Sequence, residues 1–242
     1  MRVRAIVAYD GTDYCGFQRQ TEAPTVQQAL EHALEQVTRE TSTVLAAGRT
    51  DSGVHAEGQV IAFDTAWRHG LDDLQRALNA VLPQDIAVRE VAEVPQSFHP
   101  RYSARSRSYR YSIYNSSVRD PISRRYSLHV ARPLDLAAMR LAAATLVGEH
   151  DFAAFGQPPK GSVTIRRVER VEWSAELPWL FFTIEANAFL FRMVRSVVGT
   201  LLEVGLGRLH VDEFGGILAS KDRSQAGPTA PPHGLCLMEV TY

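Results

Sequence analysis

Long hydrophobic runs are missing from this sequence of 242 residues. No stretch approaches the roughly 18 uninterrupted apolar residues of a membrane-spanning helix. The most hydrophobic region, 177–193, is interrupted by Glu185, Asn187 and Arg192. The N-terminal residues up to Tyr9 also hold too few apolar side chains for the core of a secretory signal peptide. We therefore expect a cytoplasmic protein without a membrane segment.

Cysteine is scarce too. Cys15 and Cys236 are the only two, and neither has a second cysteine or a histidine at metal-ligand spacing. A zinc site and a disulfide framework therefore have no support. The sequence also lacks a P-loop and a Gly-x-Ser-x-Gly elbow, and the glycines of 205–210 do not complete a dinucleotide fingerprint. We expect neither a metal nor a cofactor.

The net charge is only −1, but the charges are unevenly distributed. Residues 101–132 hold eight arginines and one aspartate, a local charge of +7, whereas the rest of the chain has 18 basic and 26 acidic residues. Such a segment on an otherwise acidic chain is typical of a polyanion site. The alternative is a solvated arginine face. The first four arginines of the segment are Arg101, Arg105, Arg107 and Arg110.

The periodicity of apolar residues predicts the same order of elements twice. In the first half, residues 2–9 alternate like a strand, and Thr25 with Gln28 forms a capping box before a helix. This half continues with strands 43–47 and 59–63, a helix over 71–82 and an extended segment over 85–94. The second half has predicted strands at 107–114, 163–174, 179–187 and 235–241, and helices at 135–147, 190–205 and 211–220.

The order β-α-β-β-α-β is typical of the split βαβ arrangement, called ferredoxin-like or RRM-like, in which helices cover one side of an antiparallel sheet. With 45% hydrophobic residues the chain can form a real core. We therefore predict an α+β protein of two such halves, residues 1–100 and 101–242, with a cleft between them. Two long polar loops, 115–134 and 156–162, are candidates for lining that cleft.

Three features could carry chemistry. The loop 48–56 places Arg49 and Asp51 between glycines that permit tight turns, although Asp51 could simply cap a turn. In the strand 108–114, alternation places Tyr109 and Tyr111 on one face, which suits base stacking or ordinary packing. Arg195 lies on the largely apolar helix 190–205, where it needs an anionic partner or must reach the surface.

Taken together, these segments resemble the tRNA pseudouridine synthase A family along nearly the whole chain. The loop around Asp51 is the most specific match. The departures are small, with Phe17 where tryptophan is usual, Ser52 where alanine is common and Ser196 where asparagine often follows the arginine. The matching stretches are Tyr9-Asp10-Gly11-Thr12, Gly16-Phe17-Gln18-Arg19-Gln20, Thr25-Val26-Gln27, Gly48 to Ala56, Phe98-His99-Pro100-Arg101, Arg107 to Tyr111, Asn187-Ala188-Phe189-Leu190, Met193-Val194-Arg195 and Gly234-Leu235.

The resemblance implies isomerisation of uridine to pseudouridine at positions 38, 39 and 40 of the tRNA anticodon stem-loop, without metal or cofactor. Asp51 matches the catalytic aspartate, Arg195 the arginine that pairs with it, and Tyr109 the tyrosine that stacks on the target uracil. Whether Asp51 attacks C1′, attacks C6 or abstracts a ribose proton stays open. Arg49 is placed to fill the space that a flipped uridine leaves.

The resemblance also implies a homodimer in which one tRNA contacts both subunits. The arginines Arg101, Arg105, Arg107 and Arg110 are then expected to bind tRNA phosphates. Two other functions fit parts of the pattern. An RNA-binding module or folding chaperone would need the arginines and tyrosines but not the full set of Asp51, Arg195 and Tyr109. An N-glycosidase would use similar carboxylate chemistry and release free uracil.

Overall fold

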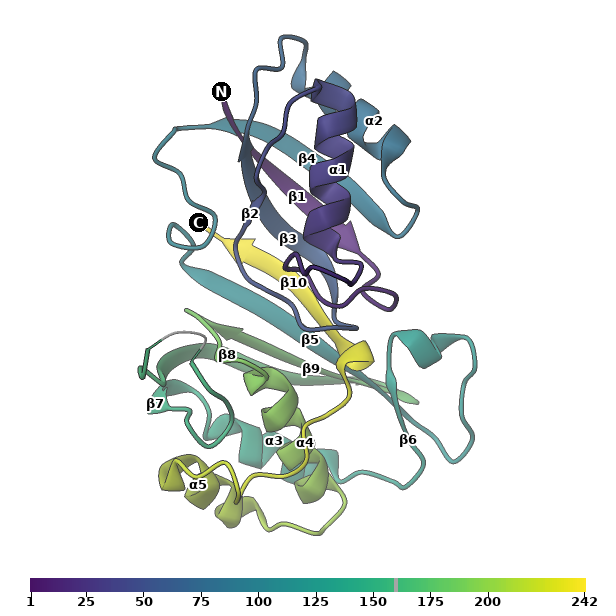
Figure 1. Cartoon of the computed structure of the whole chain (residues 1–242). Coiled ribbons are helices and arrows are strands. Elements are labelled where there is room, and N and C mark those ends of the chain that lie inside the picture. Colours follow the sequence, from purple (N-terminus) through teal and green to yellow (C-terminus); the bar gives the residue numbers. More distant parts are fainter. Residues whose placement is uncertain (159–160) are drawn as a thin grey trace. The chain divides into compact units, whose positions relative to one another are not determined.

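The computed structural model describes residues 1–158 and 161–242. The chain is an α+β protein, as predicted, and divides into two compact units. The first comprises Met1–Arg105 with Cys236–Tyr242, and the second Ser106–Leu235. Figure 1 shows the helices and strands of each unit. Pro159 and Lys160, which belong to the predicted loop 156–162, lie outside the described residues.

The first unit has the predicted order of strands and helices. In its sheet, β1 lies between β4 and β3 and is antiparallel to both, while β2 pairs antiparallel with β3. The helices α1 and α2 lie on one face of this sheet (Figure 1). The elements are β1 (Arg2–Tyr9), α1 (Val26–Thr38), β2 (Leu45–Ala46), β3 (His55–Asp64), α2 (Leu71–Val81), β4 (Ile86–Val94) and, from Cys236 onward, β10 (Leu235–Thr241).

Local sequence explains the first strand and helix. Alternate residues of β1 are buried from Val3 to Tyr9, as the period of two predicts. The predicted N-cap of α1 is confirmed, because the Thr25 side chain accepts a hydrogen bond from the Gln28 backbone N–H at 3.4 Å. The buried face of α1 then carries Val26, Leu30, Ala33 and Leu34.

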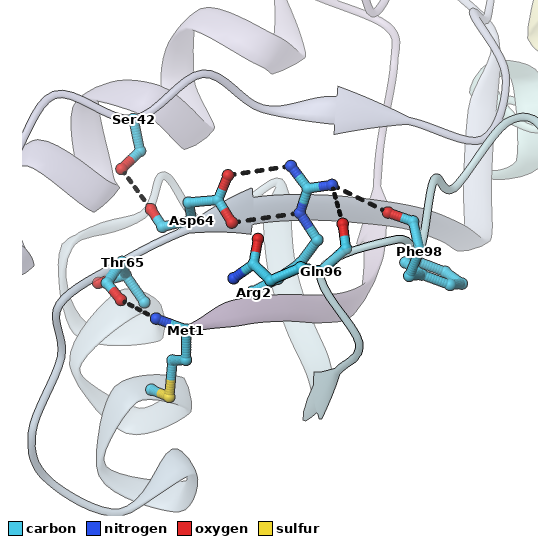
Figure 2. Close-up of polar contacts among 7 residues, drawn as sticks. All are labelled: Met1, Arg2, Ser42, Asp64, Thr65, Gln96 and Phe98. Carbon is cyan, nitrogen blue, oxygen red and sulfur yellow. Dashed lines mark hydrogen bonds and ion pairs between the residues drawn. The ribbon is translucent and has the colours of Figure 1, made fainter.

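A polar network fixes the edge where β1 begins (Figure 2). Arg2 donates two hydrogen bonds to the Asp64 carboxylate, at 2.9 and 3.2 Å, and two more to the carbonyls of Gln96 and Phe98. The Met1 amino group donates to the Thr65 carbonyl at 2.8 Å. One arginine thus joins the start of β1 to the end of β3 and to the segment that follows β4.

The predicted domain boundaries placed all of residues 101–242 in the second half. The position of the last strand differs from this prediction. Cys236–Tyr242 belong to the first unit, and β10 pairs parallel with β3. Gly58 permits this close approach, because a Cβ there would lie 2.2 Å from the Met238 carbonyl oxygen. The Arg105 N–H also donates to the Thr241 carbonyl at 2.8 Å. Pairing between segments far apart in the chain is invisible to local periodicity.

The second unit contains an antiparallel sheet in the order β5-β9-β8-β7, and β6 pairs parallel with β5. Helices α3, α4 and α5 contact one another, and α3 packs against β8. None of the helices in the described part of the chain is long and apolar enough to span a membrane. The elements are β5 (Ser106–Asn115), η1 (Ser123–Arg125), β6 (Leu128–Val130), α3 (Leu136–Ala144), β7 (Gly148–Asp151), β8 (Ile165–Glu176), β9 (Trp179–Ala186), α4 (Met193–Gly205), α5 (Val211–Ser220) and η2 (Pro232–Gly234).

Two boundaries in this unit depart from the prediction. The helix predicted over 135–147 ends at Ala144, where tight turns follow and Gly148 adopts a φ of 113°. Residues from Gly148 onward then form β7, which the apolar pattern did not reveal. The helix predicted over 190–205 begins at Met193, because Arg192 has a left-handed backbone with a φ of 62°.

Candidate active site

Asp51 lies on the loop between β2 and β3, and a buried polar cluster holds the residues beside it. Asp51 is half-buried, Arg49 is exposed and Thr50 is buried. The Thr50 hydroxyl lies 2.8 Å from the Tyr9 hydroxyl. Gln59, which is fully buried, donates from Nε2 to the Gly48 carbonyl at 2.9 Å and to the Tyr9 hydroxyl at 3.3 Å. The loop is therefore tied to β1 and β3 through side chains.

The backbone of the same loop is tied to the segment that follows β1. The Thr50 carbonyl accepts from the Phe17 N–H at 3.1 Å, and the Gly53 N–H donates to the Tyr14 carbonyl at 3.3 Å. Gly16 has a φ of 89°, and a Cβ there would lie 2.8 Å from the Thr50 carbonyl oxygen. Peptide groups on both sides of Asp51 are thus fixed, which limits where its short side chain can reach.

A third contact closes the C-terminal end of the loop. His55 is buried, and its Nδ1 lies 3.0 Å from the Gly11 N–H, which donates to it. Gly11 has no room for a side chain, because a Cβ would lie 2.0 Å from the Val54 carbonyl oxygen. Sequence reasoning gave no role to Tyr9, Gln59 or His55. The signal for Gln59 was a glutamine at the start of the predicted strand 59–63, whose other residues are apolar.

In the second unit, Tyr109 lies on β5 with only 9% of its surface exposed. Its ring meets the Phe189 ring edge to face, with 5.0 Å between centroids. Tyr109, Tyr111 and Ile113 share the buried face, which confirms the predicted alternation. The Tyr111 hydroxyl donates to the Pro231 carbonyl at 2.8 Å. Burial raises the pKa of the Tyr111 hydroxyl, and the nearby Arg195 opposes that rise.

Arg195 lies in the first turn of α4 and is half-buried. Its Nε donates to the Ala230 carbonyl at 2.8 Å, and its own carbonyl accepts from the Ala230 N–H at 3.0 Å. The segment containing Ala230 lies directly on the helix, because a Cβ at Gly199 would be 1.7 Å from the Pro228 carbonyl oxygen. The Arg195 guanidinium is therefore oriented by a backbone carbonyl.

The arginine-rich segment is divided between the two units. Arg101 and Arg105 are exposed in the first unit. In the second, Arg107 is buried and donates to the Asn187 carbonyl at 2.8 Å, so part of its hydrogen-bonding capacity is used inside the protein. The Arg110 guanidinium lies 5.6 Å from the Phe181 ring centroid, within cation–π range. Among residues 1–158 and 161–242, no three His, Cys, Asp or Glu side chains form a metal-ligand cluster.

The sequence profile of the family described as tRNA pseudouridine synthase matches residues 5–103 and 142–242. The chain belongs to this family and is therefore an isomerase. It is 48% identical to a protein of Moorella thermoacetica over 99% of both chains. A Chloroflexus aurantiacus protein is 50% identical over 99% of this chain and 88% of its own length. Both relatives are named tRNA pseudouridine synthase A.

The two matched segments contain Asp51 and Arg195, whereas Tyr109 lies between them. A chain in a solved structure titled "Crystal Structure of a Cbf5-Nop10-Gar1 Complex" is 13% identical, with a TM-score of 0.41 over 97% of this chain and 48% of that chain. A likeness of that degree is too weak to establish a common fold.

Proposed function

We propose that this pseudouridine synthase acts on uridines 38, 39 and 40 of the tRNA anticodon stem-loop, with Asp51, Arg195 and Tyr109 around the reacting nucleotide. The observation that carries the proposal is the Asp51 loop, whose peptide groups are held on both sides by the segment containing Tyr14 and Phe17. A carboxylate held in this way suits a reaction that needs one charge at a defined place. Identities of 48% and 50% to relatives named tRNA pseudouridine synthase A support tRNA as the substrate.

The reaction is an isomerisation and consumes no second substrate. The bond from ribose C1′ to uracil N1 breaks, the detached uracil turns, and a bond from C1′ to C5 forms. The C5 proton leaves, and N1 gains a proton. Asp51 supplies the carboxylate for the first step, at C1′, at C6 or at a ribose proton. Each of these roles needs the ionised form of Asp51.

Arg195 would pair its positive charge with the Asp51 carboxylate, and this pairing would compensate the partial burial of the guanidinium. The hydrogen bond from Nε to the Ala230 carbonyl supports this role, because it fixes the plane of the guanidinium. Tyr109 would stack on the uracil and hold it while it turns. The edge contact with Phe189 supports a fixed ring orientation.

A uridine in the stem must leave the base stack before Asp51 can reach it, at a cost of a few kcal/mol. Arg49 is exposed on the same loop and would fill the space that the base vacates. Arg101, Arg105 and Arg110 would bind phosphates, while Arg107 would mainly hold β5 through Asn187. We further propose a cytoplasmic homodimer in which one tRNA contacts both subunits.

The test is tritium release from an unmodified tRNA transcript labelled at uridine C5, in metal-free buffer with EDTA. Wild type is expected to release tritium, and Asp51→Ala to release none while binding tRNA within a few-fold of wild type. Asp72→Asn, at the exposed start of α2, is the matched control and should leave release unchanged. No release from any tRNA would contradict the proposal, and free uracil in place of pseudouridine would indicate an N-glycosidase.

A further inference from the structure

A pocket of about 330 Å³ lies in the second unit, apart from the residues assigned above to catalysis. It is formed by the end of β5, the segment that carries η1 and β6, and η2; Figure 1 shows η1 and β6 beside the end of β5. Its volume falls at the lower end of the range of small-ligand sites, and suits a molecule as large as one nucleotide. The residues that matter for its chemistry are Tyr114, Arg119, Arg124, Leu128, His129 and Asp120.

The loop that forms the pocket is held in a defined conformation. The two Asp120 carboxylate oxygens each lie 3.1 Å from a backbone nitrogen that donates to them, at Ile122 and Ser123. A hydrogen bond from the Ser123 hydroxyl, together with these two backbone bonds, lowers the pKa of Asp120. Asn115 donates from Nδ2 to the Val130 carbonyl at 2.8 Å and to the Arg132 carbonyl at 2.7 Å. The pocket is therefore built by the fold, although its loop is long and polar.

The charges that line the pocket favour an anion. Arg119 and Arg124 are both exposed, and no ion pair engages either of them within the part of the chain that the structure describes. Asp120 is the single carboxylate in the lining, and its oxygens already serve the backbone. Two guanidinium groups beside a cavity suit a phosphate, which they can bind with two hydrogen bonds each.

The walls of the same pocket favour a flat ring. The Tyr114 ring is held by an edge contact with Trp179, at 5.1 Å between centroids, and lies 6.2 Å from the His129 ring. His129 is itself fixed, with Nε2 2.8 Å from the Ser116 carbonyl oxygen. Leu128 adds an apolar surface. Aromatic side chains next to arginines are the usual means of binding an unstacked base together with its phosphate.

We propose that this pocket binds one unpaired nucleotide of the RNA substrate, distinct from the uridine that reacts. The base lies against Tyr114 and His129, and the phosphate lies between Arg119 and Arg124. This inference rests on the proposed function for its choice of RNA. The pocket adds affinity and fixes the register of the tRNA without taking part in the bond changes. Its loss therefore weakens binding and leaves the chemical step intact.

The test compares tRNA binding and turnover in Arg119→Gln/Arg124→Gln. The dissociation constant and KM for an unmodified transcript should rise about tenfold, with kcat within about twofold of wild type. The slope of log Kd against log salt should fall by about 0.7, the value for one lost phosphate contact on a single strand. Tyr114→Leu should raise Kd about fivefold, as expected for one lost stacking contact. Its salt slope should not change.

The matched control is Arg68→Gln/Arg76→Gln, which removes the same charge from two exposed positions of the first unit. Its Kd should stay within about twofold of wild type. An equal loss in the control, or an unchanged Kd in the pocket variant, overturns the inference. Uridine monophosphate is the second probe. If uridine monophosphate binds at the pocket, and the Arg119→Gln/Arg124→Gln variant keeps the wild-type Kd for tRNA, the site would be assigned to free nucleotides instead. Since Kd is measured without turnover, an inactive wild type would contradict only the proposed function.

Discussion

The two units hold their candidate site residues by different means. In the first unit, hydrogen bonds to Gly48, Thr50 and Gly53 fix the backbone around Asp51. In the second, a polar anchor lies near the end of the side chain, where Arg195 donates from Nε to the Ala230 carbonyl. Side-chain length explains the difference. Aspartate has few rotatable bonds, so its carboxylate follows the backbone, whereas arginine must be held at its guanidinium.

The contacts that create these anchors also differ. The first unit adds a buried polar cluster, in which Gln59 and Tyr9 hold the loop through hydrogen bonds, to the close backbone approaches at Gly11 and Gly16. The second relies on close packing, because Gly199 lets the Pro228 carbonyl lie against α4. Loss of one hydrogen bond in the polar cluster lowers stability by a small amount. An added Cβ at Gly199 must instead displace the whole segment that contains Pro228.

The largest effect should come from Asp51→Asn, which keeps the size of the side chain and removes its charge. We expect kcat to fall by at least about 10⁴-fold, because in the proposed reaction no other group can replace this carboxylate. Tritium release under single-turnover conditions measures this fall, and the midpoint of thermal unfolding shows whether the loop is intact. A loss of tRNA affinity as large as the loss of rate would mean that Asp51 acts in binding.

Arg195→Lys should have the next largest effect. Lysine keeps the charge but has no Nε–H to donate to Ala230 and no planar group to orient. We expect kcat to fall about 100-fold with KM within a few-fold, since in the proposed site the guanidinium acts on a charge at the reacting centre. Arg208→Lys, on an exposed arginine that pairs with Glu203, is the control and should leave both constants unchanged. Full activity in Arg195→Lys would show that charge alone suffices.

Gly199→Ala tests the packing of the second unit. The added Cβ would meet the Pro228 carbonyl at 1.7 Å, so the segment must move away from α4 and release Arg195. We expect unfolding free energy to fall by about 3 kcal/mol, with a loss of activity. Gly216→Ala on α5 is the matched control, because Gly216 has open space around it. That change should stabilise the protein by about 0.5 to 1 kcal/mol. Denaturant unfolding measures both changes. Equal midpoints for Gly199→Ala and Gly216→Ala would show that the close contact at Gly199 does not limit stability.

Tyr9→Phe tests the polar cluster of the first unit. It removes the hydroxyl that lies 2.8 Å from Thr50 and leaves Gln59 with one acceptor fewer. We expect a loss of about 1 to 2 kcal/mol in unfolding free energy, because buried polar groups lose partners. The kcat should fall several-fold at unchanged KM. A purely structural cluster would lower stability alone, so unchanged kcat in folded enzyme would separate the two roles.

Local pattern predicted the elements of this fold better than their contacts. The cap at Thr25 and the shared face of Tyr109 and Tyr111 depend on neighbours in the sequence, and both were predicted. The parallel pairing of β10 with β3 depends on Gly58 facing Met238, far away along the chain. No periodicity contains that information.

In the candidate site, too, local sequence predicted some features, whereas long-range contacts emerged only from the structure. Its reactive residues were chosen from motifs, and the roles of Asp51, Arg195 and Tyr109 stay predictions. The groups that anchor them, Gln59 and the Ala230 carbonyl, emerged only from the structure. Arg107 could have been placed better, since it precedes Tyr109 by two residues and so shares the buried face of β5.

The smallest expected effect is on stability at alkaline pH. Here the two units should behave alike, because each holds a tyrosine with a raised pKa. Burial raises the pKa of both Tyr14 and Tyr111 above 10.0, and in Tyr14 the hydrogen bond to Asp85 raises it further. Below pH 10 the unfolded chain keeps these protons as well, so the contribution to stability is fully present. Above pH 10 only the unfolded chain ionises, and stability falls as pH rises. Tyr111→Phe should therefore flatten the decline in unfolding free energy between pH 10 and 11.5. An equal slope in wild type and variant would show that the Tyr111 hydroxyl ionises as readily in the folded protein as in the unfolded chain.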